Sequence, residues 1–213
     1  MTIHHNLDMP EICHQRITQL LSSGRRTILG LVAPPGAGKS TLAQALLTRF
    51  GDAVQVVPMD GFHLANSELE RLGRRARKGA PDTFDAAGFV SLLARIQAQQ
   101  PGDAAVYAPE FRREIDEAVA GAIAVQHSTP LIVVEGNYLL LDDAPWSQVR
   151  GLSDEIWYLD VPADVRHARL LARHIQFGRT REAALAWIAH TDEPNAVRIA
   201  QARHHADLCV AWG

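Results

Sequence analysis

Residues 33–41, Ala-Pro-Pro-Gly-Ala-Gly-Lys-Ser-Thr, have types and spacing that suit the binding of a phosphate group. The apolar run over 27–32 before them favours a buried strand, and the apolar residues at helical spacing over 42–47 favour a helix. In a strand–loop–helix unit, the N–H groups of the loop and of the helix N-terminus converge on an anion, and the helix dipole favours negative charge there. The segment therefore predicts a phosphate-binding loop.

The loop departs in one place from the pattern G-x-x-x-x-G-K-[ST], because Ala33 stands where the first glycine is expected. A small residue still allows a tight turn, so the match is weakened and not lost. Lys39 can reach the outer phosphates, and the Ser40 hydroxyl can ligate Mg²⁺. The alternative is an ordinary strand-to-helix turn whose glycines only relieve backbone strain, and Gly-Lys-Ser-Thr after a Pro-Gly turn argues against it. We expect a nucleoside triphosphate to be held by Pro35, Gly36, Ala37, Gly38, Lys39, Ser40 and Thr41.

Two acidic residues follow apolar runs that are typical of strands: Asp60 after 53–58, and Glu135 at the end of 130–135. In an open parallel sheet, ligands lie outside the carboxyl ends of the strands, where both carboxylates would face the bound phosphates. Asp60 is therefore a candidate catalytic group. Glu135 is placed as the acid of a Walker B strand, which makes Ser40 and Glu135 the candidate ligands of Mg²⁺. Each acid also has a structural interpretation, Asp60 as a turn former or N-cap and Glu135 as a cap on a loop.

Two groups of basic residues follow different patterns. Arg166, Arg169 and Arg173 are three and four residues apart, which sets them on one face of a helix. With Gly178 after them they suggest a lid over about 174–192 that closes on phosphates, and an evenly solvated helix is the alternative. The second group, within 71–78, favours a solvated face or mobile loop, with a phosphorylated or acidic partner as the other possibility.

Length and composition limit the number of domains and the class of protein to which these residues belong. A chain of 213 residues suits one α/β domain over 1–213 with a small lid, and 47% apolar with 21% charged residues is ordinary for a soluble protein. A formal net charge of −3 argues against a nucleic-acid binder. No apolar run approaches the ~20 residues that span a bilayer. The N-terminus shows no signal-peptide pattern, so we expect a cytoplasmic protein without membrane or nucleic-acid partners.

The remaining pattern decides between the classes of protein that use such a loop. Short extended segments over 104–109 and 122–126 predict a small flap, and 206–212 predicts a final strand. No Asn-Lys-x-Asp motif for guanine is present. Two acids at strand ends and an arginine-bearing lid suit transfer of a phosphoryl group to a small alcohol, with Lys39, Mg²⁺ and lid arginines neutralising charge. The alternative is an ATP-binding accessory ATPase without a small-molecule acceptor.

Five motifs are spread along the chain: Met-Asp-Gly-Phe-His at 59–63, Arg-Lys-Gly-Ala-Pro-Asp-Thr-Phe-Asp at 77–85, Val-Tyr-Ala-Pro at 106–109, Val-Glu-Gly-Asn-Tyr-Leu-Leu at 134–140 and Asp-Glu-Pro-Asn at 192–195. Together they resemble the phosphoribulokinase/uridine kinase/pantothenate kinase branch of P-loop kinases. The similarity extends over about residues 8–212. It is greatest to small bacterial members that are labelled fructose-transport-system kinases or nucleoside/nucleotide kinase family proteins.

This resemblance implies a fold and a set of roles. The fold is a three-layer α/β sandwich around a five-stranded parallel sheet of order 2-3-1-4-5, and the protein uses ATP and Mg²⁺ and often forms a homodimer. Asp60 then resembles the general base or the acid that orients the acceptor, Arg173 the lid arginine that meets phosphate, and Lys39 the phosphate-binding lysine. Arg112 is a departure, because an Asp commonly follows that Phe in the family. The residues expected to meet the acceptor are Asp60, His63, Tyr107, Glu135 and Asn195.

Overall fold

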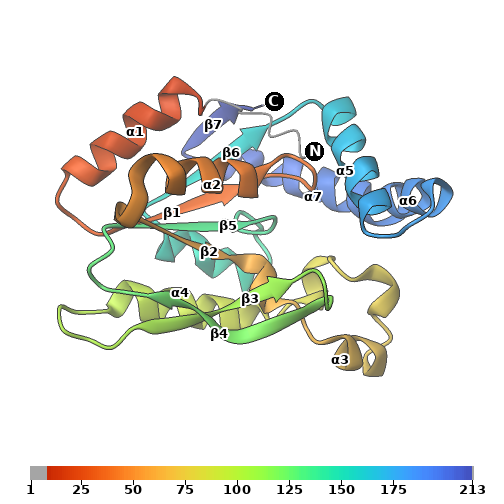
Figure 1. The fold of residues 1–213 in the computed structure, drawn as a ribbon, viewed down its shortest axis with the longest axis horizontal. Coiled ribbons are helices and arrows are strands. Elements are labelled where there is room, and N and C mark those ends of the chain that lie inside the picture. The colour runs from red at the N-terminus through yellow and green to blue at the C-terminus, as the bar shows by residue number, and fades with distance from the viewer. Residues whose placement is uncertain (1–8, 213) are drawn as a thin grey trace.

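The computed structural model describes residues 9–212 and is built on a five-stranded parallel sheet (Figure 1). The order of the strands is β2-β5-β1-β6-β7. Numbered along the chain as core strands, this is the order 2-3-1-4-5 that the family resemblance implied. The strands are β1 (Thr27–Val32), β2 (Val54–Pro58), β5 (Leu131–Gly136), β6 (Glu155–Asp160) and β7 (Leu208–Ala211).

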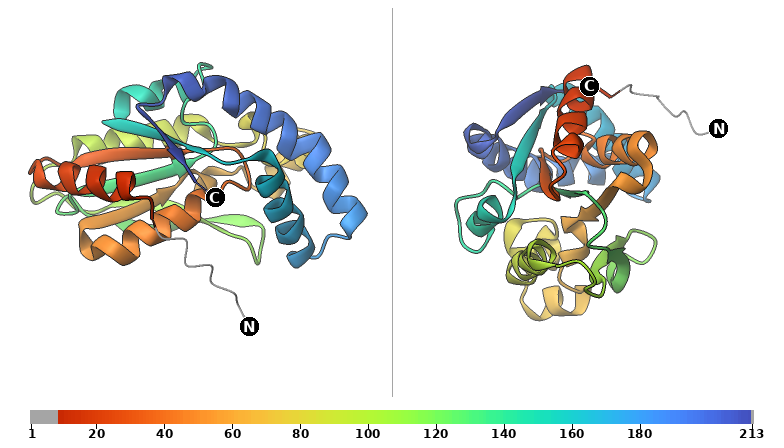
Figure 2. Two further views of the ribbon diagram at one scale, coloured as in Figure 1. Left: turned by 90° about the horizontal axis from the view of Figure 1, so that it is seen from above. Right: turned by 90° about the vertical axis from the view of Figure 1, so that its left-hand side faces the viewer.

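Helices cover both faces of this sheet, which gives the predicted three layers (Figure 2). Alternate residues of each central strand enter different cores: in β1, Ile28 packs on one side with α4, whereas Leu29 packs on the other with α1 and α2. A strand buried on both faces has no polar side, which is why 28–32 and 131–134 are uninterrupted apolar runs. The helices are α1 (Glu11–Ser22), α2 (Lys39–Phe50), α3 (Asn66–Arg71), α4 (Ala86–Ala98), α5 (Ala163–Gln176), α6 (Arg181–Trp187) and α7 (Glu193–Gln201).

A separate two-stranded antiparallel hairpin forms the predicted flap. Its strands, β3 (Val106–Arg112) and β4 (Glu117–Val125), pack against the turn that follows β2 and lie on the β2 side of the sheet (Figure 1). Both strands are longer than the sequence predicted. The reason is that much of β4 is exposed and rich in alanine, so it lacks the alternation of apolar and polar residues that marks a strand.

Helices α5 and α6 lie beyond the carboxyl ends of the strands, and a turn joins α6 to α7 (Figure 1). This turn, Ile188–Asp192, is a π-helix. Single π-helical turns are rare and occur frequently at functional sites. No helix within residues 9–212 is both long and apolar enough to cross a membrane.

Candidate active site

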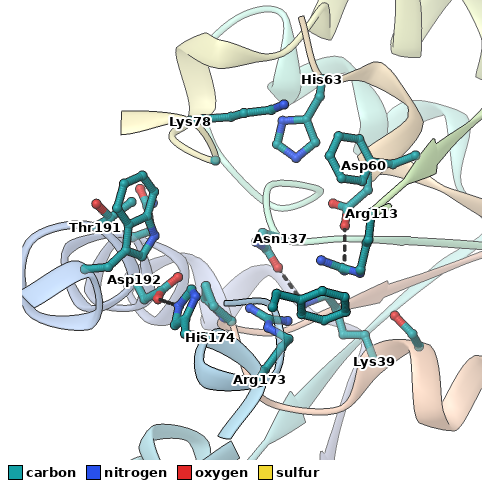
Figure 3. Close-up of a pocket in the computed structure, with 18 of the residues that line it drawn as sticks. Lys39, Asp60, His63, Lys78, Arg113, Asn137, Arg173, His174, Thr191 and Asp192 are labelled. Carbon is teal, nitrogen blue, oxygen red and sulfur yellow. Dashed lines mark hydrogen bonds and ion pairs between the residues drawn. The ribbon is translucent and has the colours of Figure 1, made fainter. Parts of the chain in front are cut away.

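A cavity of about 1270 Å³ lies at the carboxyl ends of the strands, between the flap and helices α5 and α6 (Figure 3). Most of the residues singled out in the sequence meet there. Its walls come from the phosphate-binding loop, the turn after β2, the hairpin tip, the end of β5 and the segment from α5 to α7. Among the lining residues are Pro35, Gly36, Gly38, Lys39, Ser40, Thr41, Asp60, His63, Glu135, Arg173 and Asn195.

The phosphate-binding loop owes its shape to two glycines with left-handed backbones, Gly36 (φ 78°) and Gly38 (φ 89°), and helix α2 begins directly after them. A side chain at Gly36 would place its Cβ 2.7 Å from the Arg166 carbonyl oxygen, so only glycine lets α5 pack against the loop. Ala33 fits the first position because its backbone φ is not positive, unlike those of the two glycines. Alanine in place of the first glycine of the pattern therefore introduces no backbone strain into the loop.

The Lys39 ammonium lies within this loop and is held by two oxygen acceptors. Its Nζ donates to the Ala33 carbonyl at 3.0 Å and to Asn137 Oδ1. Burial lowers the pKa of Lys39 to about 8, although Glu135 and Asp60 act in the opposite direction. Asn137 did not emerge from the sequence as a site residue. The available signal was its position two residues after Glu135, at the carboxyl end of the same strand.

The two predicted metal ligands, Ser40 and Glu135, lie within hydrogen-bond distance of each other. The Ser40 hydroxyl is 2.9 and 3.0 Å from the two Glu135 carboxylate oxygens. Burial raises the pKa of Glu135, and the nearby Lys39 cation opposes that shift. Within residues 9–212 no three His, Cys, Asp or Glu side chains cluster in a way that would hold a metal alone. Mg²⁺ is usually bound through one or two protein oxygens plus phosphates and waters, so a hydroxyl and a carboxylate at this spot suit that ion.

Asp60 and His63 stand on the opposite wall, after β2. The Asp60 carboxylate points into the cavity, where its Oδ2 is 3.6 Å from Arg113 Nη2 (Figure 3). The His63 ring is stacked on Phe84, with centroids 4.0 Å apart, and its Nδ1 is buried without a hydrogen-bond partner. Burial lowers the pKa of His63 to about 4, so the ring is neutral near pH 7.

The three arginines of α5 all face the phosphate-binding loop. Arg166 is buried and its guanidinium is 3.5 Å from the Pro35 carbonyl oxygen, while Arg169 reaches the Ala37 carbonyl oxygen at 3.4 Å. Arg173 lines the cavity, and burial lowers its pKa. No carboxylate within the described part of the chain pairs with Arg173. The alternative of an evenly solvated arginine helix is therefore wrong.

Two residues of the flap lie outside the cavity. Tyr107, which was expected to meet the acceptor, is 58% exposed, because its neighbour Ala108 takes the buried side of β3 and side chains alternate along a strand. Arg112 also points away and pairs with Glu110, with Nε 3.3 Å from Oε2. The next residue, Arg113, enters the cavity instead. The family departure at Arg112 thus falls outside the site.

Most basic residues over 71–78 are exposed, as the interpretation of a solvated face predicted: the side chains of Arg71, Arg75 and Arg77 are 68%, 44% and 48% exposed, whereas Lys78 is buried. Each pairs with an acid of this chain: Arg71 with Glu68, Arg74 and Arg77 with Asp82, and Arg75 and Lys78 with Asp116. Asp116 belongs to the hairpin tip. Arg75 and Lys78 therefore tie the flap to the segment that follows β2.

The depressed pKa of Lys39 predicts that nucleotide binding depends on pH. The protonated amine is the form that attracts phosphate, and bound phosphates raise its pKa from the value of about 8 in the free protein. The affinity for nucleotide is therefore highest well below pH 8, where Lys39 is protonated, and it falls as the pH rises through 8. We expect the Kd for MgADP to weaken by about tenfold from pH 7 to pH 9, with proton uptake at pH 9.

Isothermal titration calorimetry in two buffers of different ionisation enthalpy measures both quantities. In Lys39→Met the pH dependence should disappear, because the titrating amine is gone. An equal Kd at pH 7 and pH 9 in the unmodified protein would contradict this assignment.

Comparisons with known proteins agree with this geometry. A model of the phosphoribulokinase/uridine kinase family matches residues 28–212. Uncharacterized protein YggC from Escherichia coli (strain K12) is 37% identical over 210 residues, which are 96% of this chain and 86% of that one. A provisionally named uridine kinase, C227.14 of Schizosaccharomyces pombe, is 37% identical over 209 residues, 91% of this chain and 87% of that one.

A solved structure agrees as well. It is a provisionally named fructose transport system kinase from Silicibacter sp. TM1040, with a TM-score of 0.78 at 37% identity, and the match covers 91% of this chain and 97% of that chain. The resemblance drawn from the five sequence motifs is confirmed by these matches. The chain belongs to the phosphoribulokinase/uridine kinase family and is a P-loop kinase that acts on small metabolites.

Proposed function

We propose that the protein transfers the γ-phosphate of MgATP to a hydroxyl of a small polar metabolite, such as a sugar, a nucleoside or a pantothenate-like compound. The observation that carries this proposal is the convergence of Lys39, Ser40, Glu135, Asp60 and Arg173 on one cavity. Lys39 supplies a cation at the phosphate-binding loop, and Ser40 and Glu135 supply two metal ligands. Asp60 supplies a carboxylate on the opposite wall, and Arg173 supplies a second cation.

The donor side of the cavity would hold the nucleotide. The loop amides and Lys39 bind the phosphates, and Arg173 adds a second cation from the lid. Ser40 and Glu135 would hold Mg²⁺, which when bound neutralises charge that develops on the phosphates. We further propose that the segment 174–192 closes over the cavity as a lid, because water excluded from the site cannot compete with the acceptor.

The acceptor side would hold the hydroxyl that is phosphorylated. Asp60 orients this hydroxyl toward the γ-phosphate and accepts its proton. His63 and Asn195 line the same cavity and are the polar side chains that we assign to acceptor binding. The His63 ring packs against Phe84 and Phe111, which line the same cavity and give its acceptor side an aromatic wall.

A screen of acceptors tests the proposal. ADP release from MgATP is measured with panels of sugars, nucleosides and vitamins, each at saturating concentration. One compound should raise the rate far above basal hydrolysis and should itself become phosphorylated, as mass spectrometry would detect. A flat response over all panels, with ATP bound, would contradict the proposal and favour the accessory ATPase.

A further inference from the structure

An arginine that no sequence motif singled out stands in the middle of the cavity. Arg113 lies at the tip of the β3–β4 hairpin, and Figure 3 shows its guanidinium between Asp60 on one side and Lys39 and Arg173 on the other. Lys39 and Arg173 line the same cavity; burial is the main cause of their lowered pKa values, and the positive charge of Arg113 adds to both shifts. The side chain thus lies at the boundary between the donor and acceptor sides.

The backbone that carries Arg113 is fixed by a buried lysine. The Lys78 ammonium donates to Asn66 Oδ1 at 2.7 Å and to the Asp116 carbonyl at 2.6 Å, and it pairs with the Asp116 carboxylate at 3.1 Å. Two hydrogen bonds and an ion pair therefore hold the Lys78 ammonium in place. Asp116 has a left-handed backbone, with φ 51°. This network anchors the tip three residues after Arg113 and so presents that arginine to the cavity.

The ion pair between Arg113 and Asp60 is looser than the contacts of Lys78. The distance from Arg113 to Asp60, 3.6 Å, is longer than a hydrogen bond, and both side chains remain about half exposed, at 46% and 40%. Asp60 is its carboxylate partner within residues 9–212. A pair of this kind is weak and exchanges readily for a stronger anion. A terminal phosphate held by Lys39 would be such an anion.

We propose that Arg113 contacts the γ-phosphoryl group of the nucleotide, and that its move from Asp60 to that group frees the Asp60 carboxylate for the acceptor hydroxyl. This inference rests on the proposed kinase function. In the step it serves, a bond forms between the acceptor oxygen and the γ-phosphorus while the bond to the β–γ bridging oxygen breaks. The hydroxyl proton passes to Asp60, and Arg113 stabilises the oxygens of the group in transit.

The test compares the binding of two nucleotides, so that it needs no acceptor. The Kd values of MgADP and of Mg²⁺ with the nonhydrolysable analogue AMPPNP are measured by calorimetry for the unmodified protein and for Arg113→Gln. Loss of a charge-assisted contact to the γ-group should weaken AMPPNP by about 10-fold or more and leave MgADP within twofold. Arg112→Gln, one residue away and outside the cavity, is the matched control and should change neither Kd.

A double variant separates a direct contact from an effect of the unpaired Asp60 charge. If the loss of AMPPNP affinity persists in Asp60→Asn/Arg113→Gln relative to Asp60→Asn, Arg113 touches the γ-group. If that loss vanishes in the Asp60→Asn background, or if both nucleotides weaken equally, the inference is wrong. Failure of the unmodified protein to bind either nucleotide would instead overturn the proposed function, so the two failures are distinguishable.

Once the screen supplies an acceptor, steady-state kinetics adds an independent readout. Arg113→Gln should lower kcat strongly and leave the KM of the acceptor nearly unchanged, because the contact is to the transferred group. A raised acceptor KM with an unchanged kcat would show that Arg113 binds an anionic group on the acceptor, which would overturn the inference.

Discussion

Asp60→Asn is expected to slow phosphoryl transfer by about 10²–10⁴-fold, which is the range that a positioned general base contributes. The amide keeps the size of the side chain and can still accept a hydrogen bond from the acceptor hydroxyl, but it cannot take the proton. Because Asp60 lies across the cavity from the loop, the Kd for MgADP should change by less than threefold. Single-turnover transfer to the acceptor found in the screen, together with calorimetry, measures both effects.

A matched control uses an exposed acid outside the cavity. Asp142 is 81% exposed and pairs with His205, so Asp142→Asn should leave transfer unchanged. If Asp60→Asn transferred phosphate at nearly the rate of the unmodified protein, Asp60 would not be the base. The proposed mechanism would then have to be abandoned, although nucleotide binding by the loop would stand.

Lys39→Met is expected to lower the transfer rate by about 10²–10³-fold, as removal of one preorganised donor to a developing charge typically does. This variant should also weaken binding of MgADP, in contrast to Asp60→Asn, because Lys39 lies within the loop that binds phosphate in the ground state as well. The two variants therefore separate the donor side of the cavity from the acceptor side. Transfer kinetics and calorimetry on the same preparations make the comparison.

Arg49→Met provides the control for this second prediction. Arg49 is an exposed cation at the far end of the same helix, α2, and its guanidinium lies over the Phe50 ring. Its replacement should affect neither transfer nor affinity. A Lys39→Met protein that binds MgADP as tightly as the unmodified protein would contradict the role given to the loop lysine.

The sequence by itself determined the donor side of the site and the main sheet. The loop 33–41 needs only local geometry, since two glycines with positive φ and a helix N-terminus make the phosphate cradle whatever surrounds it. The central strands were equally clear, because burial on both faces forces apolar runs. Asp60 and Glu135 followed from these elements, since the carboxyl ends of parallel strands share one edge of the sheet.

Tertiary structure alone decided which residues of the flap enter the cavity and which residues of the basic run anchor the flap. Arg112 and Arg113 are adjacent and identical in type, and only the register of the hairpin sends one to solvent and the other into the cavity. The same alternation removed Tyr107 from the site. In the sequence Lys78 is one charge within a basic run. In the structure it pairs with Asp116, which is distant in sequence. Side-chain direction on a short exposed hairpin depends on such long-range contacts, and local sequence patterns carry no record of them.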